Sequence, residues 1–539
     1  MKHIVVTGGV VSGIGKGVFS SSIGTILKSK GHNVAHIKID PYLNFSAGMM
    51  APSEHGEVYV LNDGTETDLD LGNYERFQGI ELKSENAITG GKIFYDVINK
   101  EKNGGYGGKT LQINPNCVDE IINQINKVSS SEFVDEINKI KFVPDVVIIE
   151  LGGTVGDHES IMFLEALYKL KTSLPKEDLI FISVDFLVEL RGVEHKTRPL
   201  QISTRNLRSY GLSSDIIICR GQNEMSPEII SKISTKCSVD EDSIILLPTL
   251  SSVYKVPSFL NSKGFFNVLS KKLNIKEKES TDFYFSRLER LAKRKEKEVN
   301  IGIIAKYGCQ ADSYASVVHS INFSANEVGV HAEIIWIDSE KLEKDDEKEI
   351  ENLKSCEGII VPGGFGSRGT EGKINAIKYC RENGIPFLGI CLGMQLSVIE
   401  FARNVLGLEN PTSEEFNCKS ETQVIKYLNL NGVASKTLRL GANKIILAEN
   451  SKISSIYQDR VISERHRHRF GIATKYLEEF ENKGYVCSGK SECDNVAEIF
   501  ELQSHRFFIG VQYHPEFNAK PYCPSKLLTA FIKASTEKL

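Results

Sequence analysis

The chain of 539 residues carries a net charge of −5, with 41% hydrophobic and 25% charged residues. This length exceeds what one hydrophobic core supports, so we expect at least two domains. The composition indicates a soluble globular protein, and the slightly acidic charge argues against nucleic acid as a partner. No apolar run reaches membrane-spanning length, and the first apolar residues predict a strand and not a signal peptide. Eleven cysteines without Cys-x-x-Cys pairs indicate reduced thiols in a cytoplasmic protein and argue against a structural zinc site.

A glycine-rich segment, residues 8–17, follows the first predicted strand and precedes a predicted helix over residues 18–28. Glycines in this position let backbone amides wrap phosphates at a helix N-terminus, with Lys16 reaching the terminal phosphates. The segment departs from a Walker A loop, because it is one residue too long and Gly17 stands where a serine or threonine would bind magnesium. Ser20 is near enough in sequence to supply that hydroxyl. The alternative is a glycine turn that only packs against its helix.

Acidic residues stand at or near the ends of further apolar runs. Asp70 lies in an Asp-Leu-Asp run, and Glu150 closes the apolar run 143–150. Carboxylates beside a phosphate loop are suitable ligands for Mg²⁺, a hard cation that prefers oxygen. The alternatives are ordinary surface acids and, for Asp157, an N-cap of the helix predicted over residues 160–169.

The composition changes to dense charge over residues 268–298. This stretch predicts a domain linker that contains a solvated helix over 287–297, and the glutamates that interrupt it argue against a basic nucleic-acid arm. A new buried strand over 299–305 begins a second alternation of strands and helices. We therefore expect an α/β protein of two domains, residues 1–267 and 299–539, each with a mainly parallel sheet flanked by helices.

A second candidate site centres on Cys391, in the run Gly-Ile-Cys-Leu-Gly-Met-Gln over residues 389–395. The run lies between a predicted strand over 385–388 and a predicted helix over 396–403. This is the pattern of a nucleophile elbow, a tight turn that presents the sulfur to a helix N-terminus and so favours the thiolate. A buried core cysteine is the alternative interpretation.

Two further segments favour a catalytic cysteine. His514 supplies a base and Glu516 a group that holds the base, both directly after an apolar run. The glycine-rich turn over residues 361–366 lets backbone N–H groups approach a developing oxyanion. Together the three segments, in this order, resemble the class I glutamine amidotransferases. The resemblance implies that Cys391 attacks the glutamine carboxamide, that Gly364 lies at the oxyanion hole, and that the product is ammonia.

Six more segments extend the comparison over nearly the whole chain. They are residues 7–17, 38–42, 54–58, 66–72, 150–157 and 439–441. With these segments the chain resembles the CTP synthase family, to which the strings Glu-Thr-Asp-Leu-Asp-Leu-Gly and Gly-Gly-Thr-Val-Gly-Asp are specific. This family phosphorylates O4 of UTP with ATP and lets ammonia displace the phosphate, which makes CTP in the final step of its de novo synthesis.

The resemblance implies where ligands bind. The implied ATP contacts are Ser12, Gly13, Ile14, Gly15, Lys16, Gly17, Lys38 and Asp70, and the implied magnesium ligands are Asp70 and Glu150. The implied contacts to UTP, or to CTP as feedback inhibitor, are Ser12, Asp157, His158, Glu159, Lys196, Thr197, Arg198, Pro199, Leu200, Gln201 and Lys232. The implied glutamine contacts are Gly364, Leu392, Gly393, Met394, Gln395, Glu415 and Arg469. Arg198 and Leu200 depart from the more usual Lys and Thr of the family.

The resemblance also concerns regulation and assembly. His55 keeps its place in coupling the domains, and GTP is implied as an allosteric activator. Residues 419–436 are shorter than the usual lid of the family, which puts that activation in doubt. The run 465–469, Arg-His-Arg-His-Arg, is interpreted as a carboxylate clamp and contacts facing the synthetase domain. Homotetramers, sometimes filaments, are a further implication. Because the two sites lie in different domains, the fusion itself suggests the hypothesis of an internal ammonia path.

Two alternatives differ from this interpretation. A cobyrinate-type amidase shares the glutaminase and a deviant phosphate loop but lacks a UTP site. A nucleotide-switch ATPase of the partitioning type needs no glutaminase, so Cys391 with His514 and Glu516 argues against it.

Overall fold

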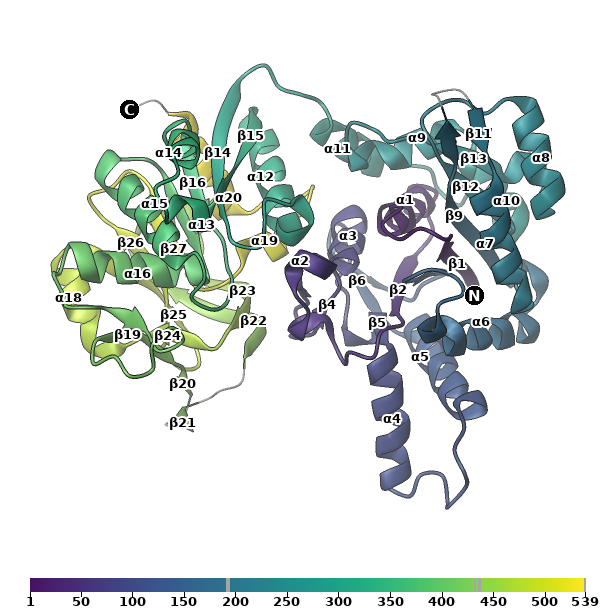
Figure 1. Cartoon of the computed structure of the whole chain (residues 1–539), viewed down its shortest axis with the longest axis horizontal. Coiled ribbons are helices and arrows are strands. Elements are labelled where there is room, and N and C mark those ends of the chain that lie inside the picture. Colours follow the sequence, from purple (N-terminus) through teal and green to yellow (C-terminus); the bar gives the residue numbers. More distant parts are fainter. Residues whose placement is uncertain (191–193, 431–432, 435–437, 538–539) are drawn as a thin grey trace. The chain divides into compact units, whose positions relative to one another are not determined.

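The structure is a computed structural model that describes residues 1–190, 194–430, 433–434 and 438–537 (Figure 1). The chain forms two compact units, and their boundary is not a single point in the sequence. The first unit comprises residues 1–49 and 70–293, and the second comprises residues 50–69 and 294–539. Residues 50–69 lie within the first predicted domain, but in the structure they belong to the second unit. The predicted domain bounds therefore remain a prediction.

A seven-stranded parallel sheet forms the centre of the first unit, in the order β13-β12-β9-β1-β8-β2-β5. Its strands are buried on both faces and are rich in valine and isoleucine, as expected for a parallel sheet between helices. The strands are β1 Lys2–Gly8, β2 Val34–Asp40, β5 Ala87–Thr89, β8 Val146–Leu151, β9 Leu179–Phe186, β12 Ile216–Arg220 and β13 Ile244–Leu247.

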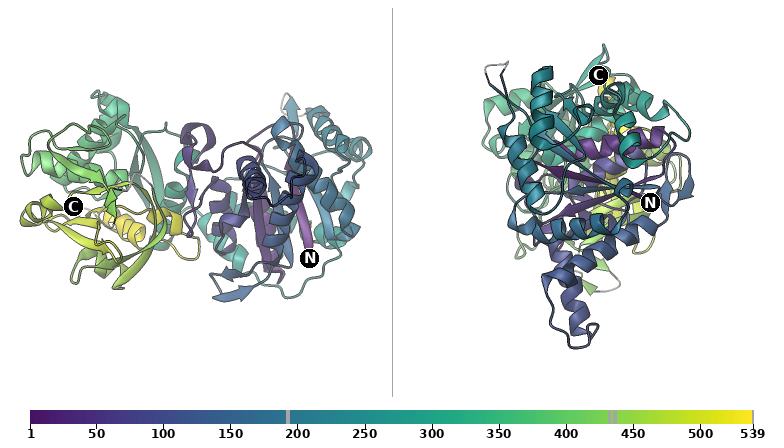
Figure 2. Two further views of the ribbon diagram at one scale, coloured as in Figure 1. Left: turned by 90° about the horizontal axis from the view of Figure 1, so that it is seen from below. Right: turned by 90° about the vertical axis from the view of Figure 1, so that its right-hand side faces the viewer.

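Helices cover both faces of this sheet (Figure 1). One face packs on a cluster from α1, α9 and α10, and the opposite face packs on α7 and α8 near one edge. The helices of the unit are α1 Lys16–Ser29, α3 Leu69–Gln78, α4 Gly90–Lys102, α5 Val118–Ser130, α6 Ile161–Ser173, α7 Arg198–Ser209, α8 Pro227–Cys237, α9 Val256–Ser262, α10 Phe265–Leu273 and α11 Phe283–Leu291. The predicted charged linker helix differs from α11, which begins earlier and buries Tyr284, Phe285 and Leu288. Helix α4 and the beginning of α5 project from the sheet as an arm (Figure 2).

The second unit contains a nine-stranded sheet in the order β15-β14-β16-β17-β27-β26-β25-β22-β23. The neighbouring strands β15, β14, β16, β17 and β27 pair in parallel. The pairs from β27 through β26, β25 and β22 to β23 are antiparallel, so the predicted parallel character holds for one side of this sheet. The strands are β14 Glu298–Ala305, β15 His331–Asp338, β16 Gly358–Val361, β17 Phe387–Ile390, β22 Arg439–Leu447, β23 Val461–His468, β25 Tyr485–Ser491, β26 Ala497–Leu502 and β27 Phe508–Val511.

Two hydrophobic clusters sandwich this second sheet. One contains side chains of α15 and α16, and the other contains side chains of α12, α17 and α20. The helices of the unit are α2 Pro52–His55, α12 Ala315–Val328, α13 Ser339–Leu342, α14 Glu347–Lys354, α15 Thr370–Asn383, α16 Leu392–Asn404, α17 Lys452–Tyr457, α18 Leu477–Asn482, α19 Pro515–Asn518 and α20 Lys526–Thr536. A three-stranded sheet joins β18 Thr412–Ser413, β19 Gln423–Tyr427 and β24 Phe470–Ile472.

Residues 50–69 pack on the second unit through directed contacts. They contain α2 and the hairpin of β3 Tyr59–Val60 with β4 Glu66–Thr67. Ser316 donates backbone and side-chain hydrogen bonds to Glu57, and the Tyr59 hydroxyl donates to the Phe517 carbonyl at 2.9 Å. Arg467 Nε lies 2.7 Å from Glu66 Oε1. Among the described residues, no helix has both the length and the apolar character of a membrane span.

Candidate active sites

The glycine-rich loop leads from β1 into α1. Gly13 and Gly15 have φ values of 68° and 86°, in the left-handed region that favours glycine, and no atom lies within 4 Å of a Cβ built on either. Gly15 precedes the first residue of α1, so the free N–H groups of the helix N-terminus directly follow this loop. The loop has the geometry of an anion-binding turn.

A pocket of about 490 Å³ adjoins this loop, entirely within the first unit. Three of the predicted ATP contacts, Ser12, Gly13 and Ile14, line it. Val11 of the same loop also lines the pocket, as do Val188 and Glu189 of the short strand β10 Val188–Leu190. The remaining lining was not predicted from the sequence and lies at or just after the ends of β9, β12 and β13: Phe186, Leu187, Arg220, Gly221, Gln222 and Thr249. Only the meeting of strand ends in a parallel sheet identifies these residues.

Lys38 joins the two predicted magnesium ligands. Its Nζ lies 3.1 Å from Glu150 Oε1, forms an ion pair with Asp70, and lies 3.9 Å from Asp40 Oδ1. The second oxygen of Glu150 accepts a hydrogen bond of 2.5 Å from the Tyr74 hydroxyl. The sheet brings these groups together because β2 and β8 are neighbours, with Lys38 paired to Glu150 in register.

Three carboxylates, Asp40, Asp70 and Glu150, surround two ammonium groups, Lys16 and Lys38. The pKa of Asp40 is raised to about 6, mainly by burial, with the charges of Asp70 and Glu150 adding to this effect and the charge of Lys38 opposing it. Burial also raises the pKa of Glu150 and lowers the pKa of Lys16. A cluster of buried carboxylates with raised pKa values is able to accept a further cation. The oxygen donors of Asp70 and Glu150 therefore fit Mg²⁺.

Asp70 lies directly against Gly17, and a Cβ at position 17 would overlap its carboxylate. This contact gives a reason for the departure from the Walker A pattern, because a carboxylate occupies the space of the missing serine or threonine side chain. Ser20, the other candidate, is fully buried, and its hydroxyl has no hydrogen-bond partner among the described residues.

Helix α7 begins with four of the predicted UTP or CTP contacts, Arg198, Pro199, Leu200 and Gln201. It lies beside the loop after β8, since Asn206 Nδ2 donates to the Val155 carbonyl at 3.2 Å. It also approaches the phosphate loop, because Ser203 and Asp185 lie against Gly9. Asp185 is a buried carboxylate at the end of β9 that the sequence analysis did not identify, and burial raises its pKa to about 6.

The predicted UTP or CTP contacts differ in exposure. The exposed members are Ser12, Asp157, His158, Glu159, Lys196, Arg198 and Lys232, and Pro199 and Gln201 are partly exposed. Thr197 is buried and accepts a hydrogen bond of 3.0 Å from Gln201 Nε2. Leu200 is fully buried in the cluster under α7, so its side chain packs in the core. The Asp157 carboxylate accepts two hydrogen bonds from Thr154 and does not cap a helix through its side chain.

Cys391 has the backbone geometry of a nucleophile elbow. Its φ of 52° and ψ of −104° are unusual for a residue other than glycine, and it directly precedes α16 at the end of β17. The turn requires close approach, because a Cβ on Gly393 would overlap the Val361 carbonyl of β16. The strand, the strained cysteine and the helix follow one another as the sequence predicts.

His514 and Glu516 form a pair beside this elbow. His514 Nδ1 lies 2.7 Å from Glu516 Oε1, which leaves Nε2 without a hydrogen-bond partner among the described residues. A Cβ on Gly363 would lie 2.9 Å from His514 Cε1 and 3.5 Å from Cys391 Cβ, so the cysteine and the histidine flank one glycine. Burial lowers the pKa of His514, but the negative charges of Glu516 and Cys391 outweigh it and raise the pKa to about 10.

The glycine turn after β16 is held by hydrogen bonds at several backbone atoms. Lys373 Nζ donates to the Pro362 carbonyl at 3.1 Å, and the Phe365 N–H donates to the Tyr307 hydroxyl at 2.9 Å. Glu415 accepts from the Gly366 N–H at 2.6 Å, and Lys306 donates to the Gly366 carbonyl. The sequence analysis identified the turn but not Lys373, Tyr307 or Lys306.

Lys373 is unusual because it is fully buried in α15. The pKa of its ammonium is lowered to about 7, mainly by burial and also by the charge of Lys306. The carbonyl and the N–H of a trans peptide point in opposite directions. The bond from Lys373 to the Pro362 carbonyl therefore fixes the direction of the Gly363 N–H.

The predicted glutamine contacts fall into two groups. Glu415 and Arg469 both lie at the glycine turn, Glu415 through Gly366 and Arg469 through the Phe365 ring at 5.9 Å. Burial raises the pKa of Glu415, and the charges of Lys306 and Arg469 oppose this effect. The second group, Leu392, Gly393, Met394 and Gln395, belongs to the first turn of α16 and is buried. Met394 packs against Gly510, a position that directs its side chain into the core.

The run Arg465–Arg469 is not an exposed basic patch. Arg465 is buried and binds Tyr59, Val60 and Asn62 of the segment 50–69. His466 and His468 are fully buried in β23. His55 lies in α2 and is exposed. The predicted short lid lies partly outside the described residues, which omit 431–432 and 435–437.

Comparison with known proteins covers both units. The CTP synthase N-terminus family model matches residues 2–275, and the class-I glutamine amidotransferase model matches residues 310–534. A CTP synthase of Encephalitozoon cuniculi is 45% identical over 540 residues, and one of Methanococcus maripaludis is 43% identical over 546 residues. Each match covers 100% of this chain and 100% of the relative.

One solved structure is similar to the second unit in sequence. The glutaminase domain of the Trypanosoma brucei CTPS, with bound acivicin, is 36% identical and has a TM-score of 0.42. The match covers 45% of this chain and 95% of the Trypanosoma brucei chain.

The full-length matches support UTP amination and not the cobyrinate-type alternative. A synthetase region precedes a class I glutaminase region in one chain, as the sequence analysis predicted. The chain therefore belongs to the CTP synthase family.

Proposed function

We propose that this glutamine-hydrolysing CTP synthase divides the ATP-dependent amination of UTP between its two units. Cys391, His514 and Glu516 would release ammonia from glutamine, and the groups around Lys16 and Lys38 would activate UTP. The observation that supports this division best is the strained Cys391 beside the His514–Glu516 pair, in a unit that does not contain the phosphate loop.

In the glutaminase reaction His514 acts as the base. It takes the proton of the Cys391 thiol to form an imidazolium beside the thiolate, in keeping with its raised pKa, and the sulfur then attacks the carbonyl carbon of the glutamine carboxamide. The N–H groups of Gly364 and Leu392 stabilise the oxyanion, since they belong to the glycine turn and to the first residue after the nucleophile. His514 then donates its proton to the amide nitrogen, which leaves as ammonia, and water hydrolyses the thioester to give glutamate and the free Cys391.

Glu415 and Arg469 are the proposed recognition groups for the amino-acid end of glutamine. A carboxylate attracts the α-ammonium group, and a guanidinium forms paired hydrogen bonds with an α-carboxylate. Their shared position at the glycine turn supports this role. Leu392, Gly393, Met394 and Gln395 would contribute through the backbone and packing of the first turn of α16.

In the first unit, the proposed ATP contacts are the loop residues Ser12 to Gly17 with Lys38 and Asp70. Lys16 and Lys38 would attract the phosphates, and the phosphoryl group passes to O4 of UTP. Ammonia then adds at C4, and phosphate leaves to give CTP. Asp70 and Glu150 are the proposed magnesium ligands, and Mg²⁺ would neutralise charge that develops on the transferred phosphoryl group.

UTP, and CTP as feedback inhibitor, are proposed to bind Ser12, Asp157, His158, Glu159 and Lys232 with the segment 196–201. Lys196 and Arg198 are exposed cations of the kind that a triphosphate needs. Position 200 would contribute only backbone, because the Leu200 side chain is in the core.

GTP is proposed as an allosteric activator and His55 as a coupling residue, on the family resemblance. The test is glutaminase activity with and without GTP in the wild type and in His55→Ala. A GTP response that is equal in the two proteins would contradict the coupling role.

The free cysteines support a cytoplasmic location, since all eleven are unpaired.

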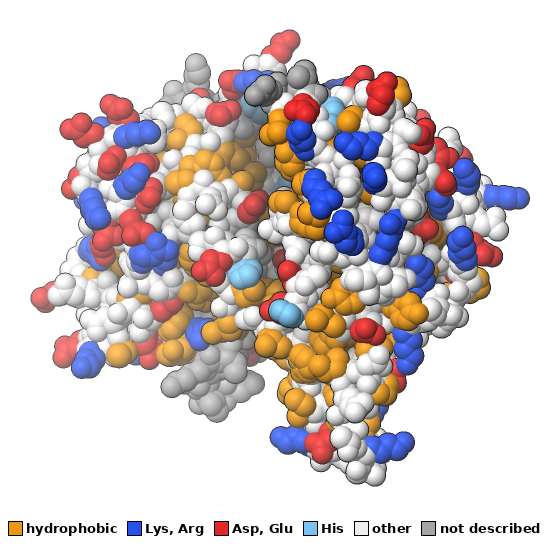
Figure 3. All heavy atoms as spheres, turned by 45° about the vertical axis from the view of Figure 1, so that its right-hand side comes forward, with side chains coloured by type: hydrophobic (Ala, Val, Ile, Leu, Met, Phe, Trp, Pro, Cys, Tyr) orange, Lys and Arg blue, Asp and Glu red, His pale blue; other side chains and the backbone are white. Residues whose placement is uncertain are grey.

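Self-association through the arm of the first unit is also proposed, with a homotetramer as the expected state and filaments as a further assembly. Exposed apolar side chains gather on the arm and its base (Figure 3). Leu43 is 71% exposed, Tyr95 and Ile98 are each 55% exposed, and the Phe45 and Tyr95 rings lie 5.4 Å apart. Apolar patches of this kind mark interaction sites, and a second copy is the expected partner. Light scattering of Tyr95→Ser/Ile98→Ser should show a smaller assembly, and an unchanged mass would contradict this proposal.

The division of labour is tested by Asp70→Asn. We expect this variant to lose CTP formation from UTP, ATP and ammonium chloride while it hydrolyses glutamine at the wild-type rate. Magnesium titration of residual activity should move to higher concentration. Glutamine hydrolysis that fell in parallel with synthesis would contradict separate sites.

A further inference from the structure

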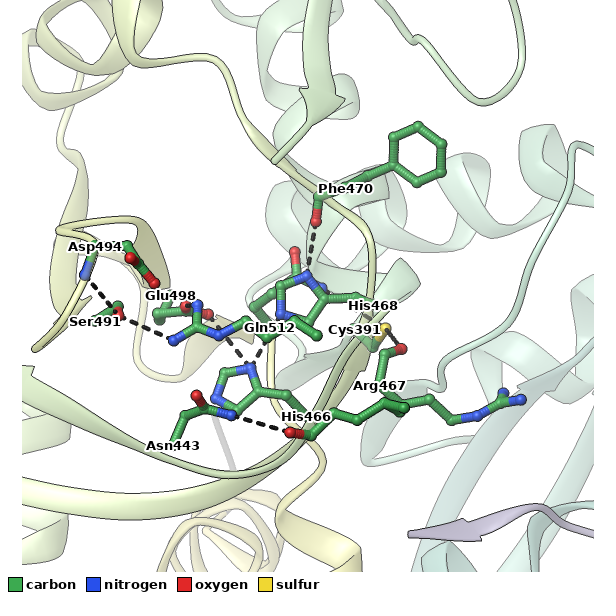
Figure 4. Close-up of polar contacts among 12 residues, drawn as sticks. Cys391, Asn443, His466, Arg467, His468, Phe470, Ser491, Asp494, Glu498 and Gln512 are labelled. Atoms are coloured by element: carbon green, nitrogen blue, oxygen red, sulfur yellow. Dashed lines mark hydrogen bonds and ion pairs between the residues drawn. The ribbon is translucent and has the colours of Figure 1, made fainter. Parts of the chain in front are cut away.

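Gln512 is a fully buried residue between β27 and His514. Its Nε2 lies 3.6 Å from Cys391 Sγ, within hydrogen-bond distance of a sulfur acceptor (Figure 4). Its backbone N–H donates to the Glu498 carbonyl at 2.8 Å, which attaches it to β26. Gln512 is not among the residues predicted from the sequence.

The orientation of the Gln512 amide is determined by a neighbour. Gln395 Nε2 donates to the Phe470 carbonyl at 3.3 Å and to Gln512 Oε1 at 3.1 Å. A carbonyl oxygen only accepts, so the Gln395 group that faces Phe470 is the NH₂ group. The Gln512 group that faces Gln395 is consequently the oxygen, and the Gln512 NH₂ group must face the sulfur.

The same Phe470 carbonyl connects this pair to a buried histidine pair. His468 Nδ1 lies 2.8 Å from the Phe470 carbonyl and must donate, so its Nε2 accepts a hydrogen bond from the His466 Nδ1–H at 3.0 Å (Figure 4). Burial lowers the pKa of His468 to about 3, so this ring is neutral at physiological pH. The hydrogen-bond network ends at His466, because Glu498 Oε2 lies 3.7 Å from His466 Nδ1, beyond hydrogen-bond distance.

His466, His468 and Glu498 have the residue types of a metal site, and their ligand atoms lie within 4.8 Å of one another. Two observations argue for hydrogen bonding instead. Arg439 forms an ion pair with Glu498, so a cation already neutralises the carboxylate. A metal would also displace the proton from His466 Nδ1 to Nε2, which has no partner among the described residues. The cluster therefore supports the position of Phe470 and, through it, Gln395.

We propose that Gln512 is a positioning residue of the glutaminase, whose amide N–H donates to the Cys391 sulfur and favours its thiolate form. This inference rests on the proposed role of Cys391 as nucleophile. Two groups at the sulfur have opposite preferences. The Arg467 carbonyl, at 3.7 Å, accepts a hydrogen bond from the thiol, whereas the Gln512 N–H donates to the sulfur and stabilises the thiolate.

Gln512 thus favours the thiolate form of Cys391, which is the form that attacks the substrate. The titratable groups that interact electrostatically with Cys391 are His514, Lys373 and Tyr307. None of them bonds to the Gln512 side chain in the described contacts, which are with Gln395 and Cys391. A substitution at Gln512 therefore removes one donor and leaves these charges in place.

The experiment uses the full chain with Gln512→Met, which keeps the size of the side chain and removes the donor. Alkylation of Cys391 by iodoacetamide is followed from pH 5 to 10. We expect its midpoint to move upward by about one pH unit, because one lost hydrogen bond to a charged group changes an equilibrium about tenfold. Glutaminase kcat/KM should fall about tenfold near neutral pH and recover at higher pH, while CTP formation with ammonium chloride is unchanged.

Ser397→Ala is the matched control, since Ser397 is equally buried in α16 and bonds to Tyr485 outside this network. It should leave the alkylation midpoint unchanged. An unchanged midpoint in Gln512→Met, with or without loss of rate, would overturn the inference. If Gln512→Met does not fold, Gln512→Glu replaces it, and a midpoint that did not rise beside the added carboxylate would also overturn it. A wild type that does not hydrolyse glutamine would instead contradict the proposed function.

Discussion

The Asp70 carboxylate fills the space beside Gly17 that a longer side chain would need. In the phosphate loop of this protein, the glycine and the carboxylate are therefore a complementary pair. The position that usually provides a magnesium-binding hydroxyl provides room for a magnesium-binding carboxylate instead.

Gly17→Ser restores the residue type of a Walker A loop and should nevertheless inactivate the synthetase. The new side chain displaces Asp70, and a displacement of about 1 Å at a reacting site costs about 100-fold in rate. CTP formation from UTP, ATP and ammonium chloride measures this loss, with glutaminase activity retained. Val18→Ala, at the next and half-buried position, is the control. Wild-type synthesis by Gly17→Ser would show that Asp70 does not need its present position.

Glu516→Gln should lower the rate of glutamine hydrolysis by about 10² to 10⁴. The neutral amide no longer stabilises the imidazolium of His514, which forms when the histidine takes the thiol proton. Steady-state hydrolysis at neutral pH measures the effect. The prediction fails if the variant retains more than about a tenth of the wild-type kcat, because even the smallest expected loss leaves only about a hundredth of it.

The same pair predicts a dependence of stability on pH. The folded-state pKa of His514, about 10, is above its usual value of 6.5, so the stabilisation is complete below pH 6.5 and is lost as the pH rises through about 10. In a Cys391→Ala background, only the contribution of Glu516 remains. The difference in free energy of unfolding between that background and its Glu516→Gln variant should be largest at pH 6 and disappear above pH 10. Urea unfolding measures it, and a difference independent of pH would contradict the pairing.

Lys373 predicts the opposite slope. Its folded-state pKa of about 7 is below the usual 10.5, so the unfolded chain binds more protons between these values and stability rises with pH. Lys373→Met removes this dependence and should gain stability relative to wild type as the pH falls from 10.5 to 7. Urea unfolding at several pH values tests the trend. Lys378→Met, on the exposed side of α15, should follow the wild type.

The sequence predicted the local parts of both sites because their signals are local. A short apolar strand, a glycine turn and an amphipathic helix are contiguous around Cys391, and the structure has β17, Cys391 and α16 in that order. The same holds for β1, the phosphate loop and α1. Glycine spacing and hydrophobic periodicity determine such units without reference to the rest of the chain.

Contacts between distant segments were not predictable in this way. Gln512 and Cys391 are 121 residues apart, and Asp70 reaches Gly17 from another helix. Nothing in the sequence around Lys373 distinguishes it from other helical lysines. Its role depends on how α15 packs against the turn that contains Pro362. The predicted solvated helix at 287–297 was wrong in its bounds, because aromatic residues before it pack in the core. These features depend on sheet order and packing, which no short window of sequence contains.

The most direct test of the account is CTP formation in wild type and in Cys391→Ala, with glutamine or ammonium chloride as nitrogen source. The wild type should make CTP with both. Cys391→Ala should make CTP only with ammonium chloride, because the first unit accepts ammonia that the second no longer produces. Loss of synthesis with both sources in the folded variant, or synthesis from glutamine by that variant, would contradict the assignment of Cys391 as the nucleophile that supplies ammonia.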